Sequence, residues 1–156
     1  MAVRVQEADF DVGAEVEALT GGNKRIGGLT LFVGLVREMH VREGLHRERI
    51  DALTLEHYPG MTEREIGRHV RDANARWPLL GVTVIHRIGE LRPGDNIVLV
   101  AVAAEHRRAA FEAAEFLMDY LKARAPFWKR EAREGRSEWI DSRDSDEAAL
   151  RRWRED

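Results

Sequence analysis

Apolar residues recur at every second position in several short segments of the chain, which is the pattern of half-buried strands. In residues 28–36, for example, Leu29, Leu31, Val33 and Leu35 fall on one face. Residues 96–104 are apolar on both faces, as in a strand that is covered on both sides. The turn sequence RPGD at 92–95 predicts that this strand pairs as a hairpin with the one before it. The expected strands are residues 3–8, 28–36, 50–57, 82–88, 96–104 and 138–142.

Other segments have the three-to-four-residue spacing of amphipathic helices. The expected helices are residues 12–19, 62–77, 106–124 and 145–153. A capping-box pair, Thr62 and Glu65, predicts the start of the second helix, while Pro78 and Pro126 end the second and third. The predicted buried stripes are Ile66, Val70, Ala73 and Trp77 in the second helix and Phe111, Ala114, Met118 and Leu121 in the third.

The order of these elements favours an α+β fold. Strands occur in clusters separated by helices, which indicates a mainly antiparallel sheet and not a doubly wound one. No repeat or linker-like stretch divides the 156 residues, so we expect a single domain, residues 1–156. Two segments without periodicity are expected to be loose loops: residues 20–28, with four glycines, and residues 39–49, which are rich in charge around Gly44.

Composition excludes several classes of function. The chain has no cysteine, which excludes a disulfide scaffold, a cysteine-bearing zinc site, a thiolate nucleophile and a persulfide carried by this chain. Its six histidines lack metal-ligand spacing, so we expect no metal site. The net charge of −3 gives no reason to expect nucleic-acid binding. The apolar runs are too short to span a bilayer, and the N-terminal segment is acidic where a signal peptide is apolar, so we expect a cytoplasmic protein that does not bind membrane.

The basic residues are divided unevenly, because only Lys24, Lys122 and Lys129 among 25 are lysines. Arginine is always charged, whereas a lysine whose pKa is lowered can exchange protons or act as a nucleophile. Lys122 and Lys129 bracket the sequence APFW beside Arg124 and Arg130, and crowded cations lower a lysine pKa. A solvated helix end explains the same cluster equally well, and spacing alone leaves both interpretations open.

A second cationic group, His106, Arg107 and Arg108, falls where a strand gives way to the longest helix. Backbone N–H groups at a helix start attract anions, so a phosphate or carboxylate pocket is favoured there over simple solvation of the helix end. His106 and Lys122 are about 24 Å apart along one continuous helix. If both belong to one site, a two-fold dimer with antiparallel long helices must bring them together.

Several long strings resemble the large, catalytic subunit of molybdopterin synthase: LTLEHYPGMTE, RWPL, VIHRIGEL, PGDNIVLVAV, HRRAAFEAAEFLMDYLKARAPFWKRE and the closing SD…RRW. The resemblance spans nearly the whole chain. It implies an α/β hammerhead fold with an additional antiparallel β-sheet and an enzyme that converts cyclic pyranopterin monophosphate to molybdopterin. The sulfur is expected as a thiocarboxylate on the C-terminal tail of a small ubiquitin-like partner subunit, without a further cofactor. The implied assembly is a heterotetramer around a homodimer of the large subunit.

The resemblance also implies which residues form the pocket. The lysines of DYLK and PFWK are Lys122 and Lys129, both expected to be catalytic, with Lys122 the principal group. The arginine after F-x-G-x-V is Arg37, an expected ligand of the substrate phosphate. The expected substrate-binding residues are Arg37, His106, Arg107, Lys122, Lys129, Arg130, Glu131 and Arg143, of which Arg143 comes from the second large subunit; Phe32 and Met118 line the channel for the partner's tail.

Two departures from the family pattern bear on the site. Ala104 stands two places before His106, where the family often has serine, so a hydroxyl contact is in doubt. The segment 39–49 is longer and more charged than the family pattern suggests, which leaves its part in closing the pocket open. The alternatives to a sulfur transferase are a non-catalytic dimeric adaptor that grips a ubiquitin-like tail and a small anion-binding enzyme unrelated to sulfur.

Overall fold

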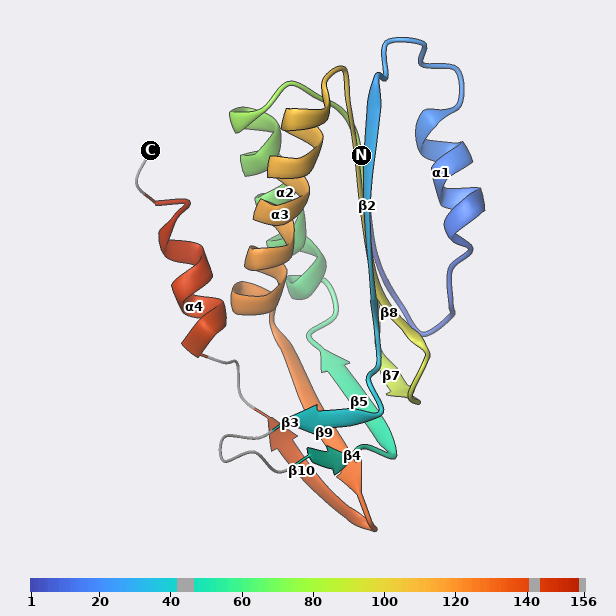
Figure 1. Cartoon of the computed structure of the whole chain (residues 1–156), viewed down its shortest axis with the longest axis vertical. Helices are drawn as coiled ribbons and strands as arrows, with labels where there is room; N and C mark the ends of the chain where they lie inside the picture. The colour runs from blue at the N-terminus through green and yellow to red at the C-terminus, as the bar shows by residue number, and fades with distance from the viewer. Residues whose placement is uncertain (42–46, 141–143, 155–156) are drawn as a thin grey trace.

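The computed structural model describes residues 1–41, 47–140 and 144–154 (Figure 1). The described elements are β1 (Ala2–Gln6), α1 (Val12–Thr20), β2 (Gly28–Leu35), β3 (Met39–Val41), β4 (Arg47–Arg49), β5 (Ala52–His57), α2 (Met61–Arg76), β6 (Leu79–Arg87), β7 (Gly89–Leu91), β8 (Asn96–Ala104), α3 (Arg107–Arg124), β9 (Phe127–Arg133), β10 (Arg136–Ile140) and α4 (Asp144–Arg151). The fold is α+β, as the sequence predicts.

The main sheet has the strand order β1-β6-β8-β2, in which β1 and β6 are parallel and the other pairs are antiparallel. Helices α2 and α3 cover one face of this sheet and α1 covers the other (Figure 1). In β8, Val98, Val100 and Val102 face α2 and α3, while Leu99 and Ala101 face the α1 side. This placement confirms that β8 is apolar on both faces because both faces are covered.

A second, antiparallel sheet has the order β10-β9-β5-β7 and lies at the lower end of the molecule in Figure 1. It corresponds to the additional sheet that the resemblance implies. Strands β6 and β8 pair as predicted, but Gly89–Leu91 between them forms β7 and joins the second sheet. Strand β9 follows α3 directly through Ala125 and Pro126, so the two sheets meet at the C-terminal end of that helix.

Both long helices depart from the sequence prediction in detail. The cap of α2 is Gly60 and not Thr62, because the Glu63 carboxylate accepts a hydrogen bond of 2.7 Å from the Gly60 N–H. Thr62 lies fully buried inside the helix. In α3, Phe111 is 61% exposed, which corrects its place in the buried stripe. The buried residues of α3 are Ala109, Ala110, Ala113, Ala114, Phe116, Leu117 and Leu121, and its small alanines let the helix lie close to β8 and β2.

Two segments expected without regular structure contain strands. Residues 39–41 and 47–49 form the antiparallel pair β3–β4, in a segment predicted to be a loose loop. Residues 127–133 form β9, where the sequence indicated only the surroundings of a helix end. In β2, the predicted alternation is interrupted by a register shift between Gly34 and Leu35. None of the helices in the described residues is long and apolar enough to cross a membrane.

Candidate active site

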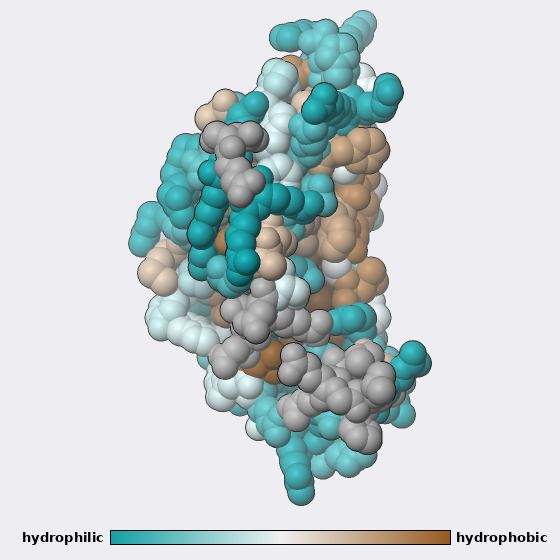
Figure 2. Space-filling view, turned by 60° about the vertical axis from the view of Figure 1, so that its left-hand side comes forward, coloured by the Kyte–Doolittle hydropathy of each residue, from teal (hydrophilic) through white to brown (hydrophobic). Residues whose placement is uncertain are grey.

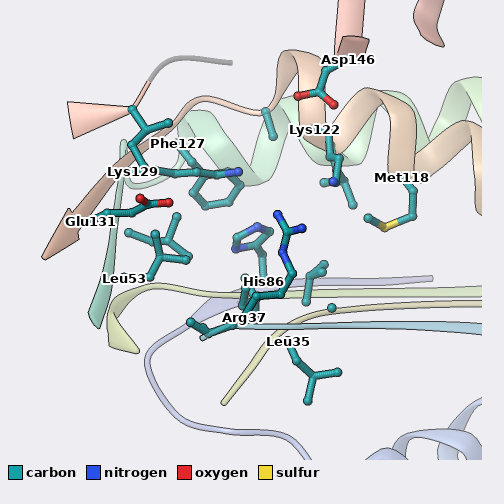
Figure 3. Close-up of a pocket in the computed structure, with 18 of the residues that line it drawn as sticks. Leu35, Arg37, Leu53, His86, Met118, Lys122, Phe127, Lys129, Glu131 and Asp146 are labelled. Atoms are coloured by element: carbon teal, nitrogen blue, oxygen red, sulfur yellow. The ribbon is translucent and has the colours of Figure 1, made fainter. Parts of the chain in front are cut away.

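A cavity of about 780 Å³ lies where the C-terminal end of α3 meets the second sheet. Its lining comes from the end of β2, from β5, β6 and β8, from the last turns of α3 and from β9 (Figure 3). Residues expected from the sequence and found here are Phe32, Arg37, Met118, Lys122, Lys129 and Glu131. Six of the predicted pocket residues, distant in the sequence, therefore share one cavity.

Three cations from three elements point into this cavity. Arg37 follows β2, Lys122 lies in the last turn of α3, and Lys129 lies on β9; Figure 3 shows their side chains directed toward the same space. Strand β9 continues from the C-terminal end of α3 through Ala125 and Pro126 (Figure 1). Lys122 and Lys129, seven positions apart, both line the cavity at this junction. Within the described part of the chain, Lys122 forms no hydrogen bond or ion pair, so its ammonium group is available to a ligand.

The cavity also has an aromatic wall. The rings of His86 and Phe127 stack with centroids 3.9 Å apart and planes inclined by 22°. His86 Nδ1 donates a hydrogen bond of 2.8 Å to the backbone carbonyl of Arg87, which can only accept. Burial lowers the pKa of His86 to about 4, so the ring is neutral at pH 7. A neutral stacked pair beneath three cations suits a flat ring that carries an anionic substituent.

Glu131 closes one side of the cavity and is buried. Its Oε1 accepts a hydrogen bond of 2.7 Å from Nδ1 of His40, and its Oε2 accepts one from Arg133. Phe127, Lys129 and Glu131 alternate along β9, so a ring, a cation and an anion project from the same face of one strand. The opposite face of β9 carries Arg130, whose guanidinium lies 5.6 Å from the ring centroid of Trp139.

Of the expected site residues that the structure describes, three lie outside this cavity: His106, Arg107 and Arg130. His106 and Arg107 are exposed at the opposite end of α3 from Lys122, as the helix geometry requires. Arg130 packs on Trp139 outside the cavity. Arg143 lies outside the described residues. Arg124, expected to crowd Lys122, forms an ion pair with Glu147, its two nitrogen atoms 2.8 and 3.0 Å from the carboxylate oxygens.

Among the cavity residues that sequence reasoning missed are its two histidines, His40 and His86. His86 had a usable signal, because it continues the buried alternation of Val82 and Val84 at a strand position where water is excluded. A titratable ring at a buried strand position indicates a candidate functional residue. His40 had no signal, because its partner Glu131 is 91 residues away in the sequence.

Comparisons with known proteins agree with this geometry. The family model described as "MoaE protein" matches residues 5–124. The molybdopterin synthase catalytic subunit of Mesorhizobium japonicum is 54% identical over 154 residues, which cover 97% of this chain and 92% of that protein. The structure of the molybdopterin biosynthesis MoaE protein from Burkholderia ambifaria matches with a TM-score of 0.83 and 46% identity and covers both chains fully. Molybdopterin synthase from Staphylococcus aureus matches with a TM-score of 0.78 and 29% identity, over 88% of this chain and 95% of that one. The chain therefore belongs to the MoaE family, to which molybdopterin synthase catalytic subunits belong.

Proposed function

We propose that this chain is the catalytic subunit of a molybdopterin synthase. It transfers sulfur to cyclic pyranopterin monophosphate from the C-terminal thiocarboxylate of a small ubiquitin-like partner subunit. The observation that carries the proposal is the convergence of Arg37, Lys122 and Lys129 on one cavity with an aromatic wall. The chain has no cysteine, so the sulfur must be supplied by another molecule. The partner tail meets that need without a further cofactor.

The three cations have different tasks because their chemistry differs. Arg37 keeps its charge at every working pH and can donate two parallel hydrogen bonds, which suits the substrate phosphate. Lys122 does what arginine cannot: it exchanges a proton or acts on the acyl carbon of the tail as sulfur leaves. Lys129, on the facing strand, binds the tail or the substrate. Phe32 and Met118 flank the approach of the tail.

The complete site draws on a second copy of the chain. Helix α3 is continuous from Arg107 to Arg124, so His106 and Lys122 of one copy remain at its opposite ends. Strand β2, at the edge of the main sheet, exposes Leu31, Phe32 and Leu35, and α3 exposes Phe111. Figure 2 shows apolar residues gathered along one side of the molecule. A two-fold dimer with antiparallel α3 helices would cover this surface and bring His106, Arg107 and Arg143 of one copy to Lys122 of the other.

The test of function mixes the protein with a thiocarboxylated small subunit and cyclic pyranopterin monophosphate and measures molybdopterin. Wild-type protein should form product, and Lys122→Ala should lose nearly all of it while the fold and partner affinity stay intact. Lys122→Arg should also be inactive, because it keeps charge and removes proton exchange. Lys24→Ala is the matched control, since Lys24 is exposed outside the cavity.

One result would contradict the role of Lys122 and another the assignment as an enzyme. Full activity of Lys122→Arg would remove proton exchange from the role of Lys122. Tight binding of the small subunit without any product from wild-type protein would favour the adaptor interpretation over an enzyme.

The dimer has its own test, a mixture of Lys122→Ala and His106→Ala proteins, each inactive alone. If each site combines Lys122 of one copy with His106 of the other, a mixed dimer contains one intact site. Equal mixing after subunit exchange should then restore about a quarter of wild-type activity. A mixture that stays inactive, or a wild-type protein that is monomeric and fully active, would refute the shared site.

A further inference from the structure

A row of ionisable side chains joins the β3–β4 hairpin to β9 at the edge of the cavity. His40 on β3 and Glu48 on β4 are directly opposite each other in the hairpin. Glu131 and Arg133 are two positions apart on β9 and therefore share a face. His40 donates to Glu131 over 2.7 Å, Arg133 pairs with Glu131, and Arg133 pairs with Glu48. These contacts thus link four side chains across the three strands β3, β4 and β9.

Three members of this row are well shielded from water. The side chains of His40, Glu131 and Arg133 are 13%, 6% and 12% exposed, whereas Glu48 is 42% exposed. Shielded charges are stable only when they are paired, and removal of one partner leaves the other uncompensated. The row is therefore a fixed arrangement, in which each contact constrains the next.

The position of Glu131 in this row changes its role in the site. One carboxylate oxygen accepts from His40 and the other from Arg133, so both face donors of the protein. An anion held in this way repels a substrate phosphate and does not bind it. Its effect on the substrate must therefore pass through a neighbour, and His40 is the neighbour that lines the 780 Å³ cavity together with Lys122 and Lys129.

Glu48 and Arg133, at the other end of the row from His40, do not line the 780 Å³ cavity. Glu48, Glu131 and Arg133 line a second cavity, of about 660 Å³, next to Arg136 and Glu138. Arg133 and Glu48 thus hold Glu131 from the second cavity, whose lining does not include Lys122 or Lys129. The row resembles the carboxylate–histidine arrangement by which enzymes fix an imidazole, with Nδ1 bound to the carboxylate and carrying the hydrogen.

We propose that His40 is a substrate-contacting residue of the sulfur-transfer site, that Glu131 orients its imidazole, and that Arg133 and Glu48 are positioning residues that hold Glu131. The inference rests on the proposed function and assigns the β3–β4 hairpin a part in the chemistry. His40 supplies an imidazole to the cavity that Lys122 and Lys129 also line. Arg133 acts on the reaction only through Glu131 and His40.

The first test needs no sulfur transfer. In the wild-type chain, the ¹⁵N resonances of the His40 imidazole should show Nδ1 bearing the hydrogen and should shift when cyclic pyranopterin monophosphate is added. In Arg133→Met, the fixed tautomer should give way to a mixture. His40 resonances that do not respond to a substrate which demonstrably binds would overturn the contact, even if the protein proved to have another activity.

The second test uses the reconstituted synthase. His40→Asn keeps an N–H donor near the Nδ1 position but removes the rest of the ring, and should lower kcat/KM about 100-fold without changing partner affinity. Arg133→Met should lower kcat/KM about 10-fold in the wild-type background and have no added effect in His40→Asn, because both act through the same residue. Arg136→Met is the matched control, since Arg136 is exposed and lines only the second cavity.

The outcomes separate the inference from the proposed function. Suppose that wild-type protein forms product, that Lys122→Ala forms none, and that His40→Asn has near-normal rates. These results would overturn the role of His40 and leave the synthase assignment standing. Equal losses from Arg133→Met in both backgrounds would show a purely structural effect on the fold and overturn the positioning role.

Discussion

His86 should make the folded state lose stability as the solution becomes mildly acidic. Its imidazole is 7% exposed and stacked on Phe127, and burial lowers its pKa from 6.5 to about 4. In the unfolded chain, the ring takes a proton near pH 6.5. Protonation between these two values therefore favours the unfolded state, so the stability present above pH 6.5 is lost progressively as the pH falls toward 4.

The size of the effect follows from the two pKa values of His86. A difference of one between folded and unfolded pKa is worth about 1.4 kcal/mol. The free energy of unfolding should therefore fall by about 2 kcal/mol between pH 8 and pH 5, and by about 3 kcal/mol once the pH is below 4. Such a loss is a large share of the stability of a domain this size.

The assay is urea unfolding of wild-type protein and His86→Asn at pH 8 and pH 5. Asparagine retains an N–H donor for the Arg87 carbonyl but does not titrate. The variant should be less stable at pH 8, because the ring stack with Phe127 is lost. Its decline from pH 8 to pH 5 should be smaller than that of the wild type by about 2 kcal/mol.

The difference between the stability losses of wild-type protein and His86→Asn cancels the contributions of other titrating groups. His69 is also buried, and burial lowers its pKa, so it destabilises both proteins in the same direction. If wild-type protein and His86→Asn lost the same stability between pH 8 and pH 5, the buried neutral state of His86 would be refuted. A ¹H NMR titration in which His86 changes near pH 6.5 would refute it equally.

Four further substitutions test the packing and the cavity. Gly27→Ala places a Cβ 2.2 Å from the backbone oxygen of Glu105 and should lower the free energy of unfolding in urea by about 2 kcal/mol or more. Gly67→Ala lies at an open position of α2 and should raise it by up to about 1 kcal/mol. Equal urea midpoints for the two variants would contradict both expectations. Phe116→Ala empties a fully buried site and should cost about 3–5 kcal/mol, and a loss below about 1 kcal/mol would show that the core closes around the gap. Lys129→Ala should reduce molybdopterin formation less than Lys122→Ala does, and unchanged steady-state constants would remove Lys129 from the site.

The sequence predicted elements best where burial is apolar and continuous. The alternation in β8 and the stripe of Ile66, Val70 and Ala73 in α2 exist because these residues face the helix–sheet core. The buried face of α3 is built largely from alanine, which carries little hydrophobic signal. Phe111 is the larger apolar residue, so the sequence predicts that it is buried, but the structure shows it exposed.

Strand β9 could not be predicted from hydrophobic periodicity. Its inward positions carry Lys129 and Glu131 because they face the cavity and not the core, so the usual apolar alternation is absent. The β3–β4 hairpin is too short to be recognised alone, and its contacts with β9 join residues more than 80 positions apart. The scarcity of lysine drew attention to Lys122 and Lys129 but left a solvated helix end as an equal interpretation, and the family resemblance assigned them to the pocket. Both lysines line the cavity.

The pairing of β9 with β5 makes the composition of the cavity sensitive to insertions in one short stretch of chain. Lys129 lies opposite Leu55 and Glu131 opposite Leu53. A single residue inserted between Pro126 and Lys129 would shift this register and exchange the inward residues for their outward neighbours. The same insertion in the turn between β9 and β10 would leave these positions unchanged. Length variation among working relatives should therefore be tolerated at that turn and selected against between α3 and β9.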